Sequence, residues 1–239
     1  MPSQARQGYR QFCPVSKTAE IFAQRWTPLL VRELCFGPKR FSELQSALPL
    51  MSRSLLARRL DELRASGVIE TEAAGNSHAY RLTRAGNELR PLIEAMSIWG
   101  QRWAQHAIVP DDLDPGSLLW SMKRQIEASG GDCGEMVVRF DFRGLPPGKP
   151  ALRYWWLVLS EGTVDVCMQD PGREADVSFE ADLTTLVNVW LGYEGLDVAL
   201  REKRLSFHGS PGLVAQLRAI LDLPFSAQEK TFRYHAPVR

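Results

Sequence analysis

Cysteine is scarce in this sequence of 239 residues, and its placement excludes several classes of protein. The four cysteines, Cys13, Cys35, Cys133 and Cys167, are widely spaced and form no CxxC pair. This spacing argues against a disulfide scaffold and against a zinc site, and it fits a protein of the reducing cytoplasm. The four histidines are equally scattered along the chain. We therefore expect no bound metal.

Long apolar runs are also missing. The longest, Tyr154 to Leu159, is far too short to cross a bilayer. The segment from Met1 to Arg10 is polar and lacks the apolar core of a signal peptide. With 44% hydrophobic and 24% charged residues, the composition is that of an ordinary globular protein. These features predict a cytoplasmic protein without a membrane partner.

The short motifs of common enzymes are absent as well. The sequence contains no GxSxG, HExxH, GxxxxGK[ST] or GxGxxG pattern. The glycine-rich stretch from Gly209 to Gly212 has the composition of a turn before a helix. An enzyme is the main alternative class for a chain of this size, and we expect neither a catalytic site nor a cofactor.

Net charge is nearly balanced at +1, but the two halves of the chain differ in sign. Residues 1–110 contain 15 lysines and arginines against 9 acidic residues, whereas residues 111–239 contain 14 against 19. The first half is therefore at +6 and the second at −5. This asymmetry favours contact with phosphates by the first half alone.

A change in composition separates the two halves. Two prolines, three aspartates and a glycine fall within the nine residues from Val109 to Ser117. Proline and glycine interrupt regular structure, so this segment has the features of a linker. We place one domain at residues 1–108, a second at 115–225 and a tail at 226–239.

Two short helices are expected in the middle of the first domain. Ser42 and Gln45 have the spacing of a capping box, and Pro49 ends the helix that Ser42 opens. A new helix begins at Ser52 and runs to about Ser66, where Gly67 follows. Two short helices joined by a tight turn predict a helix-turn-helix, whose second helix enters the major groove of DNA.

The second of these helices has one apolar side and one polar side. At 100° per residue, Leu56, Leu60 and Leu63 lie on one side, while Ser54 and Arg58 lie on the other. An arginine on the open face of such a helix can donate two hydrogen bonds to guanine O6 and N7. The pattern also fits an ordinary amphipathic helix with a solvated arginine face, and the helix alone leaves both interpretations open.

The segment after this helix favours DNA binding. Residues 68–72 and 78–82 alternate as strands, and residues 74–77 are typical of a turn. A hairpin directly after a recognition helix is the wing of a winged helix. Its small, polar tip suits a minor groove or a phosphate backbone.

An apolar stripe follows the wing. Thr83 caps a helix that restarts or kinks at Pro91, and beyond it apolar residues recur at helical spacing. They are Leu92, Ile93, Met96, Trp99 and Trp103. So wide an aromatic stripe predicts packing against a second subunit; the alternative is packing on the domain's own core.

These residues resemble the HxlR-type winged-helix regulators. The resemblance is carried by Cys13-Pro14-Val15, Arg25-Trp26-Thr27, the run from Arg32 to Phe41, Glu43-Leu44, the stretch from Leu55 to Leu60, and Tyr80-Arg81-Leu82-Thr83 leading to Gly86. It covers residues 12–104 in order. It implies a homodimer that binds a dyad-symmetric operator in double-stranded DNA, with half-sites about 34 Å apart, and it favours repression.

On this basis we name three sets of candidate residues in the first domain. The DNA-binding set is Lys39, Arg40, Ser52, Arg53, Ser54, Arg58, Arg59, Asn76, Ser77 and His78, with Arg59 either at a phosphate or bracing the fold. The dimer set is Leu92, Met96, Trp99 and Trp103. The third is Cys13, because several members of the family sense oxidants at this position. With Lys17 one turn on to stabilise a thiolate, Cys13 defines an alternative function, a redox-sensing regulator whose second domain is structural.

The second domain resembles the sterol-carrier-protein fold over residues 118–222. A helix at 118–128 precedes strands at 137–142, 153–159, 164–168 and 176–180, and helices at 183–191, 196–202 and 211–221 flank a strand at 204–207. The resemblance implies a tunnel for a small apolar effector, which Trp155, Trp156, Phe179, Leu186 and Trp190 are candidates to line; the alternative is that they form core. In addition, residues 154–159 are apolar on both faces of their strand, so something must cover each face.

The sequence as a whole therefore predicts an α+β protein, with an N-terminal winged helix-turn-helix domain followed by a sterol-carrier-protein-like α/β domain. The predicted function is a transcription regulator whose second domain senses a small apolar effector.

Overall fold

The computed structural model describes residues 8–75, 77–128, 134–145, 152–160 and 163–221. The chain forms two compact units, Met1–Met96 and Ser97–Arg239. Asn76 and the tail at 226–239 lie outside the described residues. Within the described part of the chain, no helix is both long and apolar enough to span a membrane.

The first unit opens with helices whose start and end positions follow from local chemistry. Helix α1 (Pro14–Phe22) carries proline in its first turn, and so does α2 (Thr27–Cys35), where the missing amide costs no hydrogen bond. Gly37, at φ 113°, then turns the chain out of α2, a conformation that favours glycine. Leu30, Val31 and Leu34 place α2 at the centre of this unit's core.

Helices α3 (Phe41–Ala47) and α4 (Arg53–Ala65) form the predicted helix-turn-helix. The capping box at Ser42 and Gln45 is wrong: the N-cap of α3 is Arg40, two residues earlier, and the Arg40 amide donates to Glu43 Oε2 over 2.6 Å. Gln45 instead donates from Nε2 to the carbonyl of Met51, over 2.7 Å. The side chain of Gln45 therefore holds the turn, and Glu43 caps the helix.

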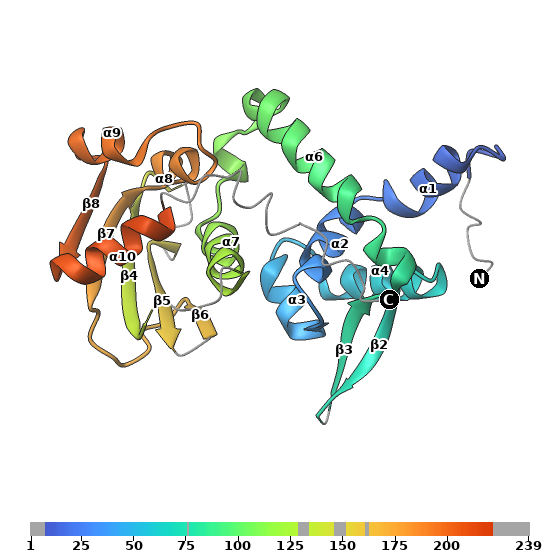
Figure 1. The fold of residues 1–239 in the computed structure, drawn as a ribbon, viewed down its shortest axis with the longest axis horizontal. Coiled ribbons are helices and arrows are strands. Elements are labelled where there is room, and N and C mark those ends of the chain that lie inside the picture. Colours follow the sequence, from blue (N-terminus) through green and yellow to red (C-terminus); the bar gives the residue numbers. More distant parts are fainter. Residues whose placement is uncertain (1–7, 76, 129–133, 146–151, 161–162, 222–239) are drawn as a thin grey trace, which may run out of the picture. The chain divides into compact units, whose positions relative to one another are not determined.

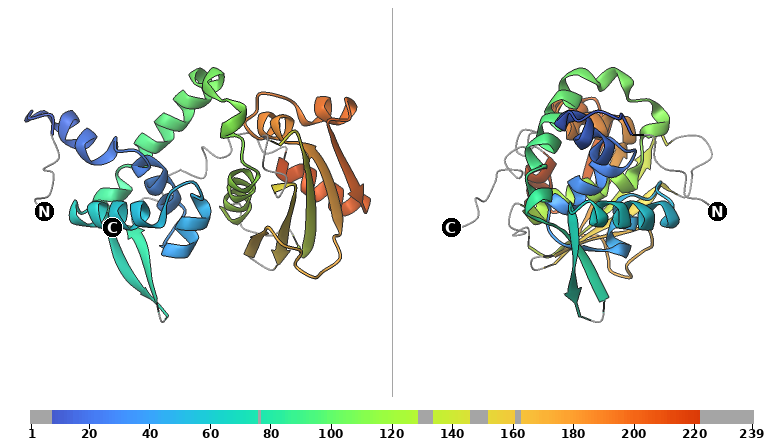
Figure 2. Two further views of the ribbon diagram at one scale, coloured as in Figure 1. Left: turned by 180° about the vertical axis from the view of Figure 1, so that it is seen from behind. Right: turned by 90° about the vertical axis from the view of Figure 1, so that its right-hand side faces the viewer.

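The predicted wing is present. Strands β2 (Ile69–Ala74) and β3 (Ser77–Leu82) pair antiparallel, and the two-residue strand β1 (Lys39–Arg40) joins the outer edge of β3 to give the order β1-β3-β2. The hairpin extends away from the helices of its own unit (Figures 1 and 2).

The helix after the wing restarts before Pro91. Thr83 Oγ1 accepts from the Gly86 amide over 3.1 Å and caps the short helix α5 (Arg84–Asn87), after which α6 (Arg90–Trp103) begins. A Cβ on Gly86 would lie 2.1 Å from the carbonyl oxygen of Val68, so only glycine fits there. The boundary between the two units falls within α6.

The helices and strands of the second unit follow one another along the chain in the predicted order. After the 3₁₀ turns η1 (Gln105–Ala107) and η2 (Pro110–Asp112), α7 (Pro115–Ala128) leads into the sheet. The strands are β4 (Met136–Arg143), β5 (Tyr154–Ser160), β6 (Thr163–Cys167), β7 (Val177–Asp182) and β8 (Leu205–Gly209). Within the described residues the sheet order is β6-β5-β4-β7-β8, with β4 and β7 parallel and the other neighbours antiparallel (Figure 1). The predicted α+β organisation is thus confirmed.

One face of this sheet forms the core of the second unit. Phe140, Phe142 and Phe179 are at most 1% exposed, and the ring of Phe140 contacts the rings of the other two. Helices α7, α8 (Leu183–Trp190) and α10 (Pro211–Leu221) add leucine, methionine and isoleucine side chains to the same cluster. At the sheet edge, the Lys123 ammonium of α7 donates to the carbonyl of Val164 on β6.

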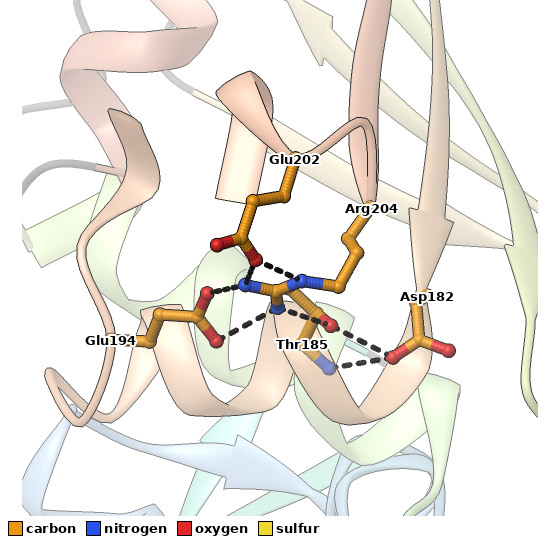
Figure 3. A network of polar contacts seen from close by, with 5 residues as sticks. All are labelled: Asp182, Thr185, Glu194, Glu202 and Arg204. Carbon is orange, nitrogen blue, oxygen red and sulfur yellow. Dashed lines mark hydrogen bonds and ion pairs between the residues drawn. The ribbon is translucent and has the colours of Figure 1, made fainter. Parts of the chain in front are cut away.

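A polar network ties β7, α8 and β8 together (Figure 3). Asp182 caps α8 by accepting from the amide and the hydroxyl of Thr185, each over 2.9 Å. The Arg204 guanidinium donates to Thr185 Oγ1 over 2.9 Å and to the carboxylates of Glu194 and Glu202. Glu202 ends α9 (Leu196–Arg201), so this arginine joins four successive segments of the chain.

Candidate DNA-binding surface

Helix α4 has one buried face and one open face. Leu56, Leu60 and Leu63 are at most 2% exposed, whereas Ser54 and Arg58 on the opposite side are exposed. This is the division that the spacing of the sequence predicted. The leucines fix the helix against its own unit, and the open side is left to contact another molecule.

The N-terminus of α4 gathers small polar groups and one arginine. Ser52 caps the helix by accepting from the Leu55 amide over 3.4 Å, and its hydroxyl also lies 3.4 Å from that of Ser54. The guanidinium of Arg53 lies over the ring of Phe41, 5.5 Å from its centroid. The side chain of Arg53 is therefore held at the start of α4 by a residue of α3.

Adjacent arginines in α4 have opposite environments. The side chain of Arg58 is 65% exposed, and its Nε is 4.0 Å from Glu62 Oε1. The side chain of Arg59 is 11% exposed, and it donates to Glu62 Oε2 over 2.6 Å. Arg58 is free to reach outward, whereas Arg59 is buried and pairs with a carboxylate of its own helix.

The remaining candidates lie on the small sheet. Lys39 and Arg40 form β1, where they pair with Tyr80 and Ala79, and Arg40 is exposed. Ser77 and His78 are exposed at the start of β3, near the tip of the hairpin. The structure thus places every described member of the DNA-binding set at the surface except Arg59, and Asn76 lies outside the described residues.

Carboxylates also lie on the wing, which sequence patterns did not single out. Arg81 on β3 pairs with Glu70 over 2.7 Å and with Glu72 over 3.0 Å, both on β2. Strand alternation puts all three side chains on one face of the hairpin. One arginine therefore offsets two negative charges on a surface predicted to face phosphates.

The predicted dimer stripe is exposed along α6. Leu92, Met96, Trp99 and Trp103 are 39%, 47%, 63% and 57% exposed, whereas Ile93, from the same spacing pattern, is 5% exposed. Ile93 is the position where this helix packs on its own unit. The other four side chains form an apolar strip on one side of the helix.

The second half of α6 belongs to the second unit and is hydrogen-bonded within it. Gln101 Nε2 donates to the Leu191 carbonyl over 2.8 Å, and the Tyr193 hydroxyl donates to the Gln101 carbonyl over 2.9 Å. The partners are 90 and 92 positions apart, so no local sequence pattern predicts these bonds.

Cys13 is the N-cap of α1 and is half-buried. Lys17, proposed to stabilise its thiolate, donates instead to both carboxylate oxygens of Glu20, each over 3.1 Å. Cys35 is buried, and burial raises the pKa of its thiol from 9.0 to about 11. Among the described residues there is no group of three side chains that would suit a metal ion.

Most of the candidate ligand-lining residues belong to the core of the second unit. Trp155, Phe179, Leu186 and Trp190 are at most 5% exposed and pack in its main apolar cluster. The two buried indoles are also hydrogen-bonded, Trp155 to the Leu152 carbonyl and Trp190 to the Ser121 hydroxyl. Trp156 points to the other face of β5 and is partly exposed.

Comparison with known proteins finds a family model that matches part of each unit. The model of the HxlR-like helix-turn-helix family matches residues 21–108, and that of the SCP-2 sterol transfer family matches residues 131–222. From Bacillus subtilis (strain 168), the "Uncharacterized HTH-type transcriptional regulator YvaP" is 35% identical over 97 residues, covering 39% of this chain and 90% of that protein. The HTH-type transcriptional regulator YodB of the same strain is 30% identical, covering 39% and 87%.

A solved structure of the reduced form of YodB from B. subtilis is 29% identical, covers 40% of this chain and 97% of that one, and gives a TM-score of 0.36. The alignments with YvaP and YodB span nearly all of those regulators. The chain therefore belongs to the HxlR-like helix-turn-helix family of transcriptional regulators, and it carries a second unit that matches the SCP-2 sterol transfer family.

Proposed function

We propose that this chain is a cytoplasmic repressor that binds a dyad-symmetric operator in double-stranded DNA as a homodimer and responds to a small apolar effector held by its second unit. The observation that carries the DNA-binding part is the open face of α4. There Arg58 is exposed directly opposite a leucine stripe that is almost wholly buried. The proposal assigns no catalytic step to either unit.

In this proposal α4 enters the major groove. Arg58 donates two hydrogen bonds to guanine O6 and N7. Ser52, Arg53 and Ser54, at the N-terminus of the helix, contact base edges or the adjacent phosphates. Arg59 stays with Glu62 and braces the helix, because removing so buried an arginine from its carboxylate would leave both charges uncompensated.

The small sheet contributes the contacts that do not depend on sequence. Lys39 and Arg40 lie on phosphates, and the wing tip with Asn76, Ser77 and His78 follows the minor groove or the backbone next to it. These cationic contacts supply affinity that falls as salt rises. The net charge of +6 over residues 1–110 favours this assignment.

Dimerisation follows from the α6 stripe. Leu92, Met96, Trp99 and Trp103 leave an apolar strip in water unless another surface covers it. A two-fold dimer covers the same strip on both subunits at once. Two recognition helices related by that axis require half-sites about 34 Å apart.

The test of DNA binding is the affinity of the full-length protein for duplexes selected from a random pool, measured by fluorescence anisotropy. Arg58→Ala is expected to cost about 1–3 kcal/mol and to relax preference at one position of each half-site. The matched control is Arg64→Ala, since Arg64 lies in the last turn of α4 and pairs with Asp61 over 3.0 Å. A uniform loss for all sequences would assign Arg58 to a phosphate.

The test of the effector is native mass spectrometry of the freshly purified protein, followed by binding measurements. We expect a dimer that carries a few hundred daltons of extra mass, and weaker or stronger operator binding once that molecule is removed. Only a molecule with different affinity for the two states can shift them. Equal operator affinity with and without every bound apolar molecule would overturn the sensing role.

Redox sensing through Cys13 is the second candidate function. It is favoured by the position of Cys13, a free cysteine at the N-cap of α1 whose side chain is only half-buried and so can be reached by an oxidant. The bond between Lys17 and Glu20 weakens it, because the ammonium is already engaged. If Cys13→Ser abolishes an oxidant-induced loss of operator binding, this function replaces effector sensing and the second unit is structural.

A further inference from the structure

Leu50 is 71% exposed although it lies in a tightly held turn between α3 and α4. Its neighbours in the turn, Leu48 and Met51, are 4% and 1% exposed. The Met51 amide donates to the Leu48 carbonyl over 3.0 Å and closes the turn. Gln45 Nε2 binds the Met51 carbonyl from the side of α3. The turn is anchored at both ends, so the fold itself turns Leu50 outward.

Exposure by itself assigns no role, because single apolar side chains are common on protein surfaces. The position of Leu50 in the chain, however, indicates a role. It lies two residues before Ser52, the N-cap of α4, and is followed within four residues by the exposed side chains of Arg53 and Ser54. The N-terminal residues of a recognition helix are those that contact base edges.

We propose that Leu50 contacts the C5 methyl group of a thymine in the major groove and so selects a T·A pair at one position of each half-site. The inference rests on the proposed function, in which α4 is the recognition helix. The thymine methyl is the apolar group that base pairs present in this groove. The polar groups at the start of α4 can hydrogen-bond to phosphates and to base nitrogens or oxygens. The side chain of Leu50 is purely apolar, so it suits the thymine methyl group.

The test removes the methyl group from the DNA and leaves the protein unchanged. In a duplex selected by the full-length protein, each thymine in turn is replaced by deoxyuridine, which pairs identically but lacks the methyl group. Affinity is measured by fluorescence anisotropy. At one position per half-site we expect binding to weaken about fourfold, the effect of one buried hydrocarbon group. Elsewhere the substitution has no effect.

The variant Leu50→Ala turns the test into a double-mutant cycle, with one change in the DNA and one in the protein. It is expected to bind the thymine duplex more weakly and to bind the thymine and deoxyuridine duplexes equally. Leu29→Ala is the matched control, since Leu29 is a partly exposed leucine of α2 at 37%, and it keeps the preference for thymine. Because Leu50 is exposed, its removal leaves no cavity that would unfold the protein.

The outcomes separate this inference from the function on which it rests. If no sequence is selected above random DNA, the proposed function itself fails. If a sequence is selected but every deoxyuridine duplex binds as well as its parent, Leu50 reads no methyl group. The same conclusion follows if the half-sites contain no thymine, or if Leu50→Ala keeps the full preference.

Discussion

The guanidinium of Arg53 lies over the ring of Phe41, 5.5 Å from its centroid, and this contact joins the two helices of the helix-turn-helix. A cation over an aromatic face at an exposed site contributes about 0.5–1 kcal/mol. In the proposed complex, Arg53 would therefore contact the DNA from a position that Phe41 already restricts, and it would lose less side-chain entropy on binding.

Phe41→Leu is expected to weaken operator binding about two- to fivefold, the equivalent of that contact, although Phe41 itself touches no DNA. The measurement is anisotropy with the selected duplex. In an Arg53→Ala background the same substitution should cost nothing further. An equal loss in both backgrounds would show that Phe41 acts through α3 and not through Arg53.

Arg81 on the wing offsets Glu70 and Glu72, which would otherwise repel phosphates. Arg81→Ala is expected to weaken binding to all DNA sequences by roughly 0.2–1 kcal/mol at low salt, the range for exposed ion pairs, and by less as salt rises. The triple variant Glu70→Gln, Glu72→Gln, Arg81→Ala should recover the loss. If it does not, Arg81 contacts the DNA directly.

Trp99 and Trp103 carry the largest exposed area of the α6 stripe. Replacing both by alanine is expected to weaken the dimer by about 2 kcal/mol or more, as for aromatic residues at the centre of an interface. Sedimentation velocity at a series of concentrations measures this. Trp156→Ala is the matched control, because Trp156 is a partly exposed tryptophan on β5. A dimer unaffected by the double variant would place the interface elsewhere.

Cys35 makes the stability of the first unit depend on pH under alkaline conditions. Burial raises the pKa of its thiol from 9.0 to about 11, so the folded protein keeps a proton that the unfolded chain loses above pH 9. Its stabilising contribution is complete below pH 9 and disappears as pH rises through about 11. Urea unfolding between pH 8 and 11 measures this, and Cys35→Ser should flatten the decline. Iodoacetamide at pH 9 should label the half-buried Cys13 and spare Cys35.

Thr185 is the buried centre of the network in Figure 3. Its hydroxyl donates to Asp182 and accepts from Arg204, both over 2.9 Å. Thr185→Val removes both bonds at nearly constant shape and is expected to destabilise the protein by about 1–3 kcal/mol. The control is Thr184→Val, at the exposed neighbouring position. Equal urea midpoints for the two variants would contradict a stabilising role for the network.

Local sequence signals predicted the fold well where the pattern and the structure depend on the same residues. The strands of the second unit agree within a few residues, because glycine and proline mark their ends and alternation marks their faces. The leucine stripe of α4 came from helical periodicity alone. Ser52 and Thr83, both small polar residues before a helix, are caps as predicted.

The sequence did not reveal contacts that depend on tertiary packing. The spacing placed Arg59 at the border of the apolar stripe, and only packing shows that it is buried beside Glu62. Strand β1 is two residues long, too short for any periodicity. The misplaced cap of α3 has a similar cause: Ser42 and Gln45 have suitable spacing, but Glu43 competes for the same helix end and Gln45 is needed at the turn.

The bond between Lys123 and the carbonyl of Val164 affects whether the sheet of the second unit can associate with other copies at high concentration. Among the described residues β6 is the last strand on its side of the sheet, and an unpaired edge strand is a template on which a strand from another molecule can add. An ammonium group seated on that edge blocks the carbonyl and would be buried without water if a foreign strand approached. For two copies to join through this edge of the sheet, the Lys123 ammonium would first have to be displaced. Symmetric contact between helices requires no such step and is therefore the easier way for two copies to associate.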